Sequence, residues 1–420
     1  MFAWIQNMEV YMNREEAAAL LSRYDQLQLL TYFDELNETE QNSLLAQIES
    51  IDWSLLDLLK NRTTTEESRG VLEPLGALEV DEIERRRDEF EAIGAEAIRS
   101  GKVGAVLLAG GQGTRLGYDG PKGTFNVGVT RDLYIFECLI NNLMDVVNRV
   151  GAWVPLYIMT SDKNHEETTS FLKDHSYFGY HADFIHFFKQ EMAPSVGYDG
   201  KLLLEEKGKL SLSPNGNGGW FSSLMKAGYL EVLKESGVEW LTVFAVDNVL
   251  QRINDLAFVG GVIASGCECG GKVVRKAAPD ERVGVLCLED GRPSIVEYYE
   301  MTDDMIHLRD EKGNLLYNFG VILNYMFRLD RLEEIQNTSL QIHVVEKKIP
   351  YVDENGTIVK PETPNGYKFE ALVLDMVHLM NSCCAYEVVR EREFAPIKNL
   401  HGIDSVDSAR ELLVKNGVTL

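Results

Sequence analysis

The chain has 420 residues, 45% of them hydrophobic and 25% charged, which is the composition of a globular protein large enough for more than one domain. Its 41 basic residues stand against 66 acidic ones, a net charge of −25, so its surface repels the phosphates of nucleic acid. A small phosphorylated ligand is not excluded, because a few local cations can hold it.

The sequence also argues against a membrane or secreted protein. The apolar runs are shorter than the roughly 18 residues of a membrane span, and the first residues show no signal-peptide pattern. The six cysteines form no paired clusters at metal-site spacing, which favours reduced thiols. We therefore expect a cytoplasmic protein that binds neither membrane nor nucleic acid.

The N-terminal part is predicted to be helical. Residues 14–60 carry helical patterns, and Asn37 followed by Glu40 is a capping pair at a helix start. A further helix is predicted over 81–99. We expect residues 1–100 to form a helical N-terminal segment.

From residue 103 onward, apolar runs alternate with helical patterns. The runs predict strands at 103–109, 153–159, 184–188 and 240–246, and the patterns between them include 133–147 and 220–237. Strands that are apolar on both faces indicate an α/β fold, with a mostly parallel sheet covered by helices. Such sheets bind ligands beyond the carboxyl ends of their strands.

Two elements are predicted in the last hundred residues. The run 349–361 predicts a hairpin with its turn at 354–356, where Asn and Gly are adjacent. The run 367–380 predicts a helix.

A glycine-rich stretch follows the first strand, over "LAGGQGTRLG" at 108–117, with "PKG" at 121–123. It matches neither the dinucleotide fingerprint nor the P-loop. Glycines let backbone N–H groups approach a nucleotide, and Arg115 and Lys122 can neutralise phosphate charge. The alternative is a mobile surface turn, which the two cations and the preceding buried strand make less favoured.

Three further features follow strand ends. Asp247 comes after the fourth strand, where a carboxylate suits Mg²⁺, although a turn or helix-cap aspartate is the alternative. Gln190 ends the third strand and could read a base edge, or be a plain surface glutamine. The glycine-rich run 213–220 opens a helix and again allows close backbone approach.

The run "LAGGQGTRLG" with "PKG" resembles the signature of the eukaryote-type UDP-sugar pyrophosphorylases, and is most similar to the UDP-N-acetylhexosamine (UDP-N-acetylglucosamine) branch. The resemblance covers nearly the whole chain. Further segments match in order, among them "SPNGNGG", "FAVDN", "IVEYYE", "LYNFGVI", "PNGYKFE" and "EREFAPIKN".

The resemblance implies a Rossmann-like nucleotidyltransferase sheet of GT-A-like type, flanked by helices, over residues 101–395. It implies the formation of a UDP-sugar and pyrophosphate from UTP and a sugar 1-phosphate, most simply N-acetylglucosamine or N-acetylgalactosamine 1-phosphate, with Mg²⁺. The implied nucleotide-binding residues are Leu108, Ala109, Gly110, Gly111, Gln190 and Gly218. The implied sugar-binding residues are Asn217, Glu297, Tyr298 and Asn318. Arg115, Lys122 and Lys398 are the implied catalytic phosphate partners, and Asp247 the implied metal ligand.

Two other functions remain open at this point. Gln112 favours the N-acetylhexosamine branch, but a UDP-glucose or broad UDP-sugar pyrophosphorylase is the near alternative. A catalytically silent UDP-sugar-binding protein is another, which the presence of all the implied phosphate partners disfavours. The family's members continue into a further C-terminal domain, whereas this chain stops at Leu420, so residues 396–420 are expected to be a short tail.

Overall fold

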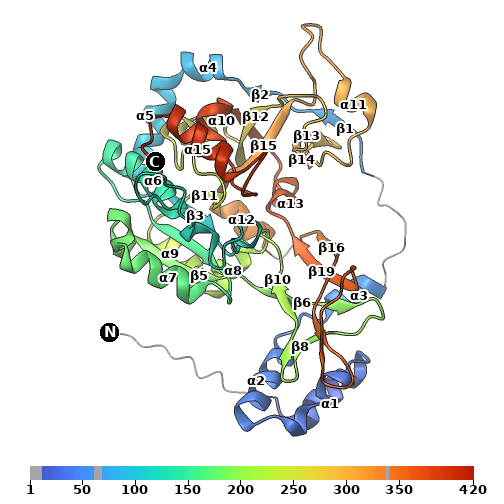
Figure 1. Cartoon of the computed structure of the whole chain (residues 1–420). Coiled ribbons are helices and arrows are strands. Elements are labelled where there is room, and N and C mark those ends of the chain that lie inside the picture. The colour runs from blue at the N-terminus through green and yellow to red at the C-terminus, as the bar shows by residue number, and fades with distance from the viewer. Residues whose placement is uncertain (1–11, 61–68, 337–339) are drawn as a thin grey trace. The chain divides into compact units, whose positions relative to one another are not determined.

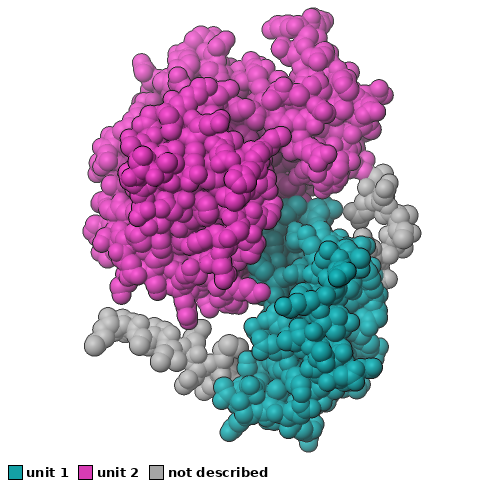
Figure 2. Space-filling model, in the orientation of Figure 1, with its two compact units in different colours: residues 1–68, 191–217, 341–372 teal, residues 69–190, 218–340, 373–420 magenta. Residues whose placement is uncertain are grey.

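The computed structural model describes residues 12–60, 69–336 and 340–420, which group into two compact units (Figures 1 and 2). The smaller unit joins the described residues up to 60 with 191–217 and 341–372, and the larger unit holds the others. The two units do not coincide with the three segments expected from the sequence, because each unit combines several separate stretches of the chain. The physical reason is that the short N-terminal helices bury their apolar faces against strands from distant parts of the chain.

The smaller unit is built from short elements around one core. Leu21, Leu44 and Ile48 of its helices are buried together with Val196 and Phe369 of its strands. Its elements are α1 (Arg14–Arg23), α2 (Glu38–Glu49), α3 (Ser54–Lys60), β6 (Met192–Pro194), β7 (Val196–Gly197), β8 (Leu204–Glu206), β9 (Lys209–Leu210), β10 (Leu212–Pro214), β16 (Ile342–Lys347), β17 (Tyr351–Val352), β18 (Ile358–Val359) and β19 (Gly366–Ala371).

Local signals in this unit have mixed outcomes. The capping pair is confirmed, because Asn37 Oδ1 accepts the N–H of Glu40 at 3.0 Å and Glu40 Oε2 accepts that of Asn37 at 2.9 Å. The hairpin is confirmed as β17 and β18. The helix expected over 367–380 is wrong in its first half, which is strand β19. Pairing with β16 and β7, with Phe369 and Ala371 buried on alternate positions, overrides the helical pattern.

The larger unit contains the long apolar strands. Its elements are β1 (Leu72–Pro74), β2 (Ala77–Leu78), α4 (Val80–Arg85), α5 (Arg87–Arg99), β3 (Val103–Leu108), α6 (Ile135–Val150), β4 (Leu156–Thr160), α7 (His165–Asp174), β5 (Ile185–Lys189), α8 (Trp220–Lys226), α9 (Tyr229–Glu235), β11 (Trp240–Ala245), α10 (Leu256–Ser265), β12 (Cys269–Arg275), β13 (Val285–Glu289), β14 (Arg292–Val296), α11 (Asp303–His307), β15 (Phe319–Arg328), α12 (Leu329–Ile335), α13 (Val373–His378), β20 (Cys383–Glu387), α14 (Arg390–Glu393) and α15 (Val406–Lys415).

The described residues of this unit form an eleven-stranded mixed sheet with the central order β2-β20-β12-β15-β11-β3-β4-β5. The strands predicted from the four apolar runs are confirmed as β3, β4, β5 and β11, and β15 runs antiparallel to β11. Neighbouring residues of β3 face two separate cores: Leu107 packs into the one that includes α6, and Val106 into the one that includes α8. Among the described residues, none of the helices has the length and apolar content to span a bilayer.

One edge of this sheet gathers the segments singled out in the sequence. Strands β3 and β11 are parallel neighbours whose last residues, Leu108 and Ala245, are register partners. The chain therefore leaves both strands at the same edge. Strand β15 begins at this edge because it runs the opposite way.

Candidate nucleotide and phosphate site

The glycine-rich stretch is a closed loop that leaves the end of β3 and returns. The N–H of Gly113 donates to the carbonyl of Gly120 at 2.9 Å, and that of Lys122 donates to the carbonyl of Gly111 at 3.1 Å. The 3₁₀ turn Thr114–Leu116 carries the exposed Arg115. The loop thereby brings Lys122 back to the glycines at the strand end.

Gln190 lies directly against this loop. Its side chain is buried, and a Cβ atom added at Gly110 would lie 2.6 Å from its Nε2 atom. Only glycine leaves room for this contact, whereas a Cβ added at Gly111 would meet open space. The structure thus brings Gln190 together with the predicted nucleotide-binding run that begins at Leu108.

Asn164 shapes the loop and was not singled out in the sequence. Its Nδ2 donates to the carbonyls of Ala109 at 2.9 Å and Gly111 at 3.3 Å, and its Oδ1 accepts the N–H of Ser161 at 2.8 Å. The residue is fully buried. Its sequence signal is weak, because an asparagine four residues past the end of a strand is ordinary turn chemistry.

We expect Asn164→Ala to lower the free energy of unfolding by roughly 1–3 kcal/mol, because it leaves buried backbone carbonyls without a donor. The KM for the nucleotide should rise, since the loop that Asn164 holds would be less ordered. Urea unfolding and steady-state kinetics measure both effects, with Asn148→Ala, at an exposed position of α6, as control. Unchanged stability and unchanged KM would show that the loop holds its shape without this residue.

Lys122 and Asp247 lie at the centre of a cluster of charged side chains that also includes Arg115 and Lys398. The Nζ of Lys122 is 4.0 Å from Oδ2 of Asp247, and the lysine side chain is only 12% exposed. Burial lowers the pKa of Lys122, the Asp247 carboxylate opposes this, and the positive charges of Arg115 and Lys398 lower it further. The positive charges of Arg115 and Lys398 therefore lie close enough to interact with that of Lys122, as expected of a site that binds a polyanion.

Lys398 reaches the cluster through pairing of backbone segments. The N–H of Ile397 donates to the carbonyl of Asp247 at 2.8 Å, and Asn248 and Pro396 form an antiparallel bridge. Lys398 is half-buried, and its Nζ is 3.1 Å from Oδ2 of Asp404. A bound phosphate would compete with Asp404 for this ammonium group.

The donor set suits a magnesium ion held mainly by a substrate. Among the described residues, no group of three or more His, Cys, Asp or Glu side chains could hold a metal ion by itself. Asp247 offers one carboxylate that is 26% exposed and has Lys122 as its ion-pair partner. Mg²⁺ is commonly bound by one or two carboxylates together with waters and phosphate oxygens, so Asp247 fits that role.

The implied sugar-binding residues Glu297 and Asn318 lie at one corner of β13, β14 and β15. A Cβ added at Gly284 would lie 3.2 Å from Oε1 of Glu297, and the carbonyl of Gly284 accepts the N–H of Val321 at 2.9 Å. Asn318 is buried, and its Oδ1 accepts the N–H of Lys276 at 3.1 Å.

Tyr298 follows Glu297 and is 42% exposed. The guanidinium of Arg282 lies 6.0 Å from the centroid of its ring. Its phenol is thus on the surface beside the corner that Glu297 and Asn318 form.

The second glycine-rich loop contains the point where the chain passes from one unit to the other. Asn217 is the last residue of its segment in the smaller unit, and Gly218 is the first of the larger. Gly216 has a φ of +89°, and a Cβ there would lie 2.1 Å from the carbonyl oxygen of Ala371. This glycine is thus required for packing on β19.

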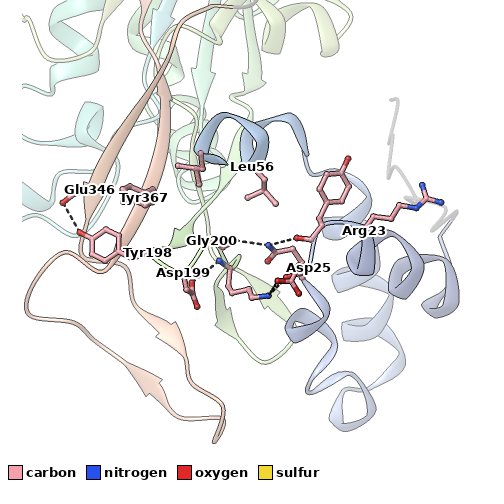
Figure 3. Close-up of a pocket in the computed structure, with 12 residues that line it drawn as sticks. Arg23, Asp25, Leu56, Tyr198, Asp199, Gly200, Glu346 and Tyr367 are labelled. Carbon is pink, nitrogen blue, oxygen red and sulfur yellow. Dashed lines mark hydrogen bonds and ion pairs between the residues drawn. The ribbon is translucent and has the colours of Figure 1, made fainter. Parts of the chain in front are cut away.

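A pocket of about 800 Å³ lies within the smaller unit (Figure 3). Two pairs of its polar groups contact each other: Lys201 lies 2.7 Å from Asp25, and the Tyr198 hydroxyl donates to Glu346 at 3.0 Å. Its lining includes none of the predicted site residues. We therefore place the candidate site at the sheet edge of the larger unit.

A helix-flanked mixed sheet, with a glycine-rich loop and lysines at the carboxyl edge, defines an α/β protein of the nucleotidyltransferase type. Residues 53–416 match the family model described as UTP–glucose-1-phosphate uridylyltransferase. The chain belongs to this family, and it is a uridylyltransferase.

Relatives from several eukaryotes are similar over most of their length. The UDP-N-acetylhexosamine pyrophosphorylase-like protein 1 of Mus musculus is 37% identical over 92% of this chain and 81% of its own. The UDP-N-acetylglucosamine pyrophosphorylase of Saccharomyces cerevisiae is 31% identical over 94% and 88%. The crystal structure of the Trypanosoma brucei enzyme of that name, in complex with an inhibitor, has a TM-score of 0.83 and 28% identity over 96% and 85%.

Proposed function

We propose that this uridylyltransferase joins UTP to N-acetylglucosamine 1-phosphate or N-acetylgalactosamine 1-phosphate, giving a UDP-sugar and pyrophosphate. The observation that carries the proposal is the meeting of the glycine-rich loop with Lys122, Asp247 and Lys398 at one sheet edge. The names of the relatives in yeast and in Arabidopsis thaliana support N-acetylglucosamine as the sugar.

In the proposed reaction, a phosphate oxygen of the sugar 1-phosphate attacks the α-phosphorus of UTP. One P–O bond forms there as the bond to the β-phosphate bridging oxygen breaks, and pyrophosphate leaves. The nucleophile is already an anion, so a general base is not needed. Positioning and charge stabilisation are the main tasks of the protein, as in other phosphoryl-group transfers.

The chain's residues divide these tasks. The backbone N–H groups of Gly110 and Gly111 approach the nucleotide, whereas that of Ala109 is already donated to the carbonyl of Met159 at 2.8 Å. The Gln190 amide reads the base. Lys122, Arg115 and Lys398 neutralise the phosphates, and Glu297 and Asn318 accept or donate hydrogen bonds to the sugar.

We also propose that Asp247 holds Mg²⁺, which when bound supplies positive charge that neutralises phosphate oxygens. A cytoplasmic location is part of the proposal, supported by the six cysteines, which are free thiols in the structure.

The rate is expected to fall at alkaline pH because Lys122 must be charged. Burial lowers the pKa of Lys122, so the charged form is lost at a lower pH than for an ordinary lysine as the pH rises. The value of kcat/KM, which reports the free enzyme, should therefore decline in this range. Lys122→Arg keeps its charge at such pH and should lose this limb of the profile, whatever its absolute rate. An unchanged limb would assign it to another group.

Glu297→Ala is expected to raise the KM for the sugar 1-phosphate by roughly tenfold or more, the effect of losing a hydrogen bond to a charged group. The KM for UTP should stay within about twofold, since Glu297 is implied to contact only the sugar. Glu311→Ala, at an exposed position, is the control. A change in UTP affinity alone would place Glu297 outside the sugar pocket.

The sugar itself is tested by comparing kcat/KM for the 1-phosphates of N-acetylglucosamine, N-acetylgalactosamine, glucose and galactose at fixed UTP. The proposal expects the two N-acetylated sugars to be preferred. A preference for glucose 1-phosphate would favour the UDP-glucose alternative.

A further inference from the structure

Lys398 belongs to a segment that buried polar groups hold against the residues that follow β11, which include Asp247. Asn248 Nδ2 donates to the carbonyl of Glu393 at 2.7 Å, and Asn248 Oδ1 accepts the N–H of Ala395 at 2.9 Å. Asn248 is buried, so these hydrogen bonds are shielded from water. One side chain thus joins the residues after β11 to the residues at the end of α14, which are far apart in the chain.

A buried ion pair fastens the same segment a second time. The Nζ of Lys272 lies 2.5 Å from Oε2 of Glu393 and also donates to the carbonyl of Arg252 at 2.9 Å. The lysine side chain is 0% exposed and the glutamate side chain 10% exposed. Such a pair adds little net stability compared with apolar residues, but it tolerates only a narrow geometry.

The ion pair connects strand β12 of the sheet with the segment that leads to Lys398. Lys272 is in β12, Glu393 ends α14, and the chain reaches Lys398 a few residues later. Along the way, the N–H of Ile397 donates to the carbonyl of Asp247. A displacement of Glu393 would therefore shift residues 394–397 and, with them, the ammonium group of Lys398.

We propose that Asn248, Lys272 and Glu393, here called the clasp, are positioning residues that set Lys398 relative to Asp247 and Lys122. The inference rests on the proposed function, because it requires Lys398 to act on the phosphates. The clasp itself touches neither substrate. Its effect on catalysis passes through Lys398.

The test is a double-mutant cycle on kcat between Glu393→Gln and Lys398→Ala. Lys398→Ala alone should lower kcat, and Glu393→Gln alone should lower it by roughly ten- to hundredfold, the cost of misplacing a charge partner. In the Lys398→Ala background, Glu393→Gln should lower kcat by less than about twofold, because the group it positions is already gone. Glu391→Gln, an exposed neighbour, is the control.

Thermal unfolding of each variant separates positioning from loss of fold. Asn248→Ala is the second variant, because it releases the segment without leaving Lys272 buried and unpaired, and it should show the same non-additivity. Equal losses from Glu393→Gln in both backgrounds, or full activity of both clasp variants, would overturn the inference. If Lys398→Ala alone kept full kcat, the proposed role of Lys398 would fail, and the inference with it.

Discussion

Replacing Lys122 with alanine is expected to lower kcat by roughly 10²–10³-fold, the loss typical for one preorganised donor to a developing charge. The lysine side chain is 12% exposed, and its ammonium group lies 4.0 Å from Asp247. The backbone N–H of the same residue donates to the carbonyl of Gly111. A cation already stripped of water offsets charge on a leaving pyrophosphate more strongly than one in solvent.

The fold should survive this change. Lys122→Ala keeps the backbone hydrogen bond to Gly111, and Asp247 retains contact with solvent, so no buried charge is stranded. Lys173→Ala, at an exposed position of α7, is the matched control. Steady-state kinetics and thermal unfolding measured together check the prediction. Near-normal turnover in the folded variant would remove Lys122 from the catalytic group.

Asp247→Asn is expected to lower kcat to a similar extent, roughly 10²–10³-fold, if its carboxylate holds the metal ion. The variant keeps the size of the side chain and the backbone carbonyl that accepts the N–H of Ile397. It removes the negative charge that opposes the lowering of the Lys122 pKa, so that pKa should fall further.

Titration with Mg²⁺ distinguishes the two effects of Asp247→Asn. Loss of a metal ligand predicts a higher Mg²⁺ requirement, with partial recovery at high concentration. Asp174→Asn, exposed at the end of α7, is the control. An unchanged Mg²⁺ requirement together with an unchanged kcat would contradict the assignment.

Local patterns in the sequence predict much of this fold. The continuous apolar runs correspond to β3, β4, β5 and β11, and the pair Asn37 and Glu40 caps α2 as expected. These signals succeed because a continuous apolar run and a capping pair are patterns of residues close together in the chain. The edge of the sheet, and hence the meeting of Lys122 with Asp247, follows from parallel strand order.

Features that depend on residues far apart in the chain could not be predicted from the sequence. The composition of the smaller unit comes from burial shared by α1, α2 and strands far along the chain. The clasp is of the same kind: Lys272 within an apolar strand signals a buried charge, but nothing local identifies Glu393 as its partner. The roles of the site residues remain predictions, which the variants above test.

We expect this chain to transfer a uridylyl group from UTP to a sugar 1-phosphate. The most direct measurement is release of pyrophosphate with Mg²⁺ and N-acetylglucosamine 1-phosphate, comparing UTP with ATP, GTP and CTP and with the sugar omitted. We expect pyrophosphate and UDP-N-acetylglucosamine in equal amounts, with UTP strongly preferred and with dependence on the sugar. If no combination of a nucleoside triphosphate with any of the four sugar 1-phosphates released pyrophosphate, the proposed activity would be wrong.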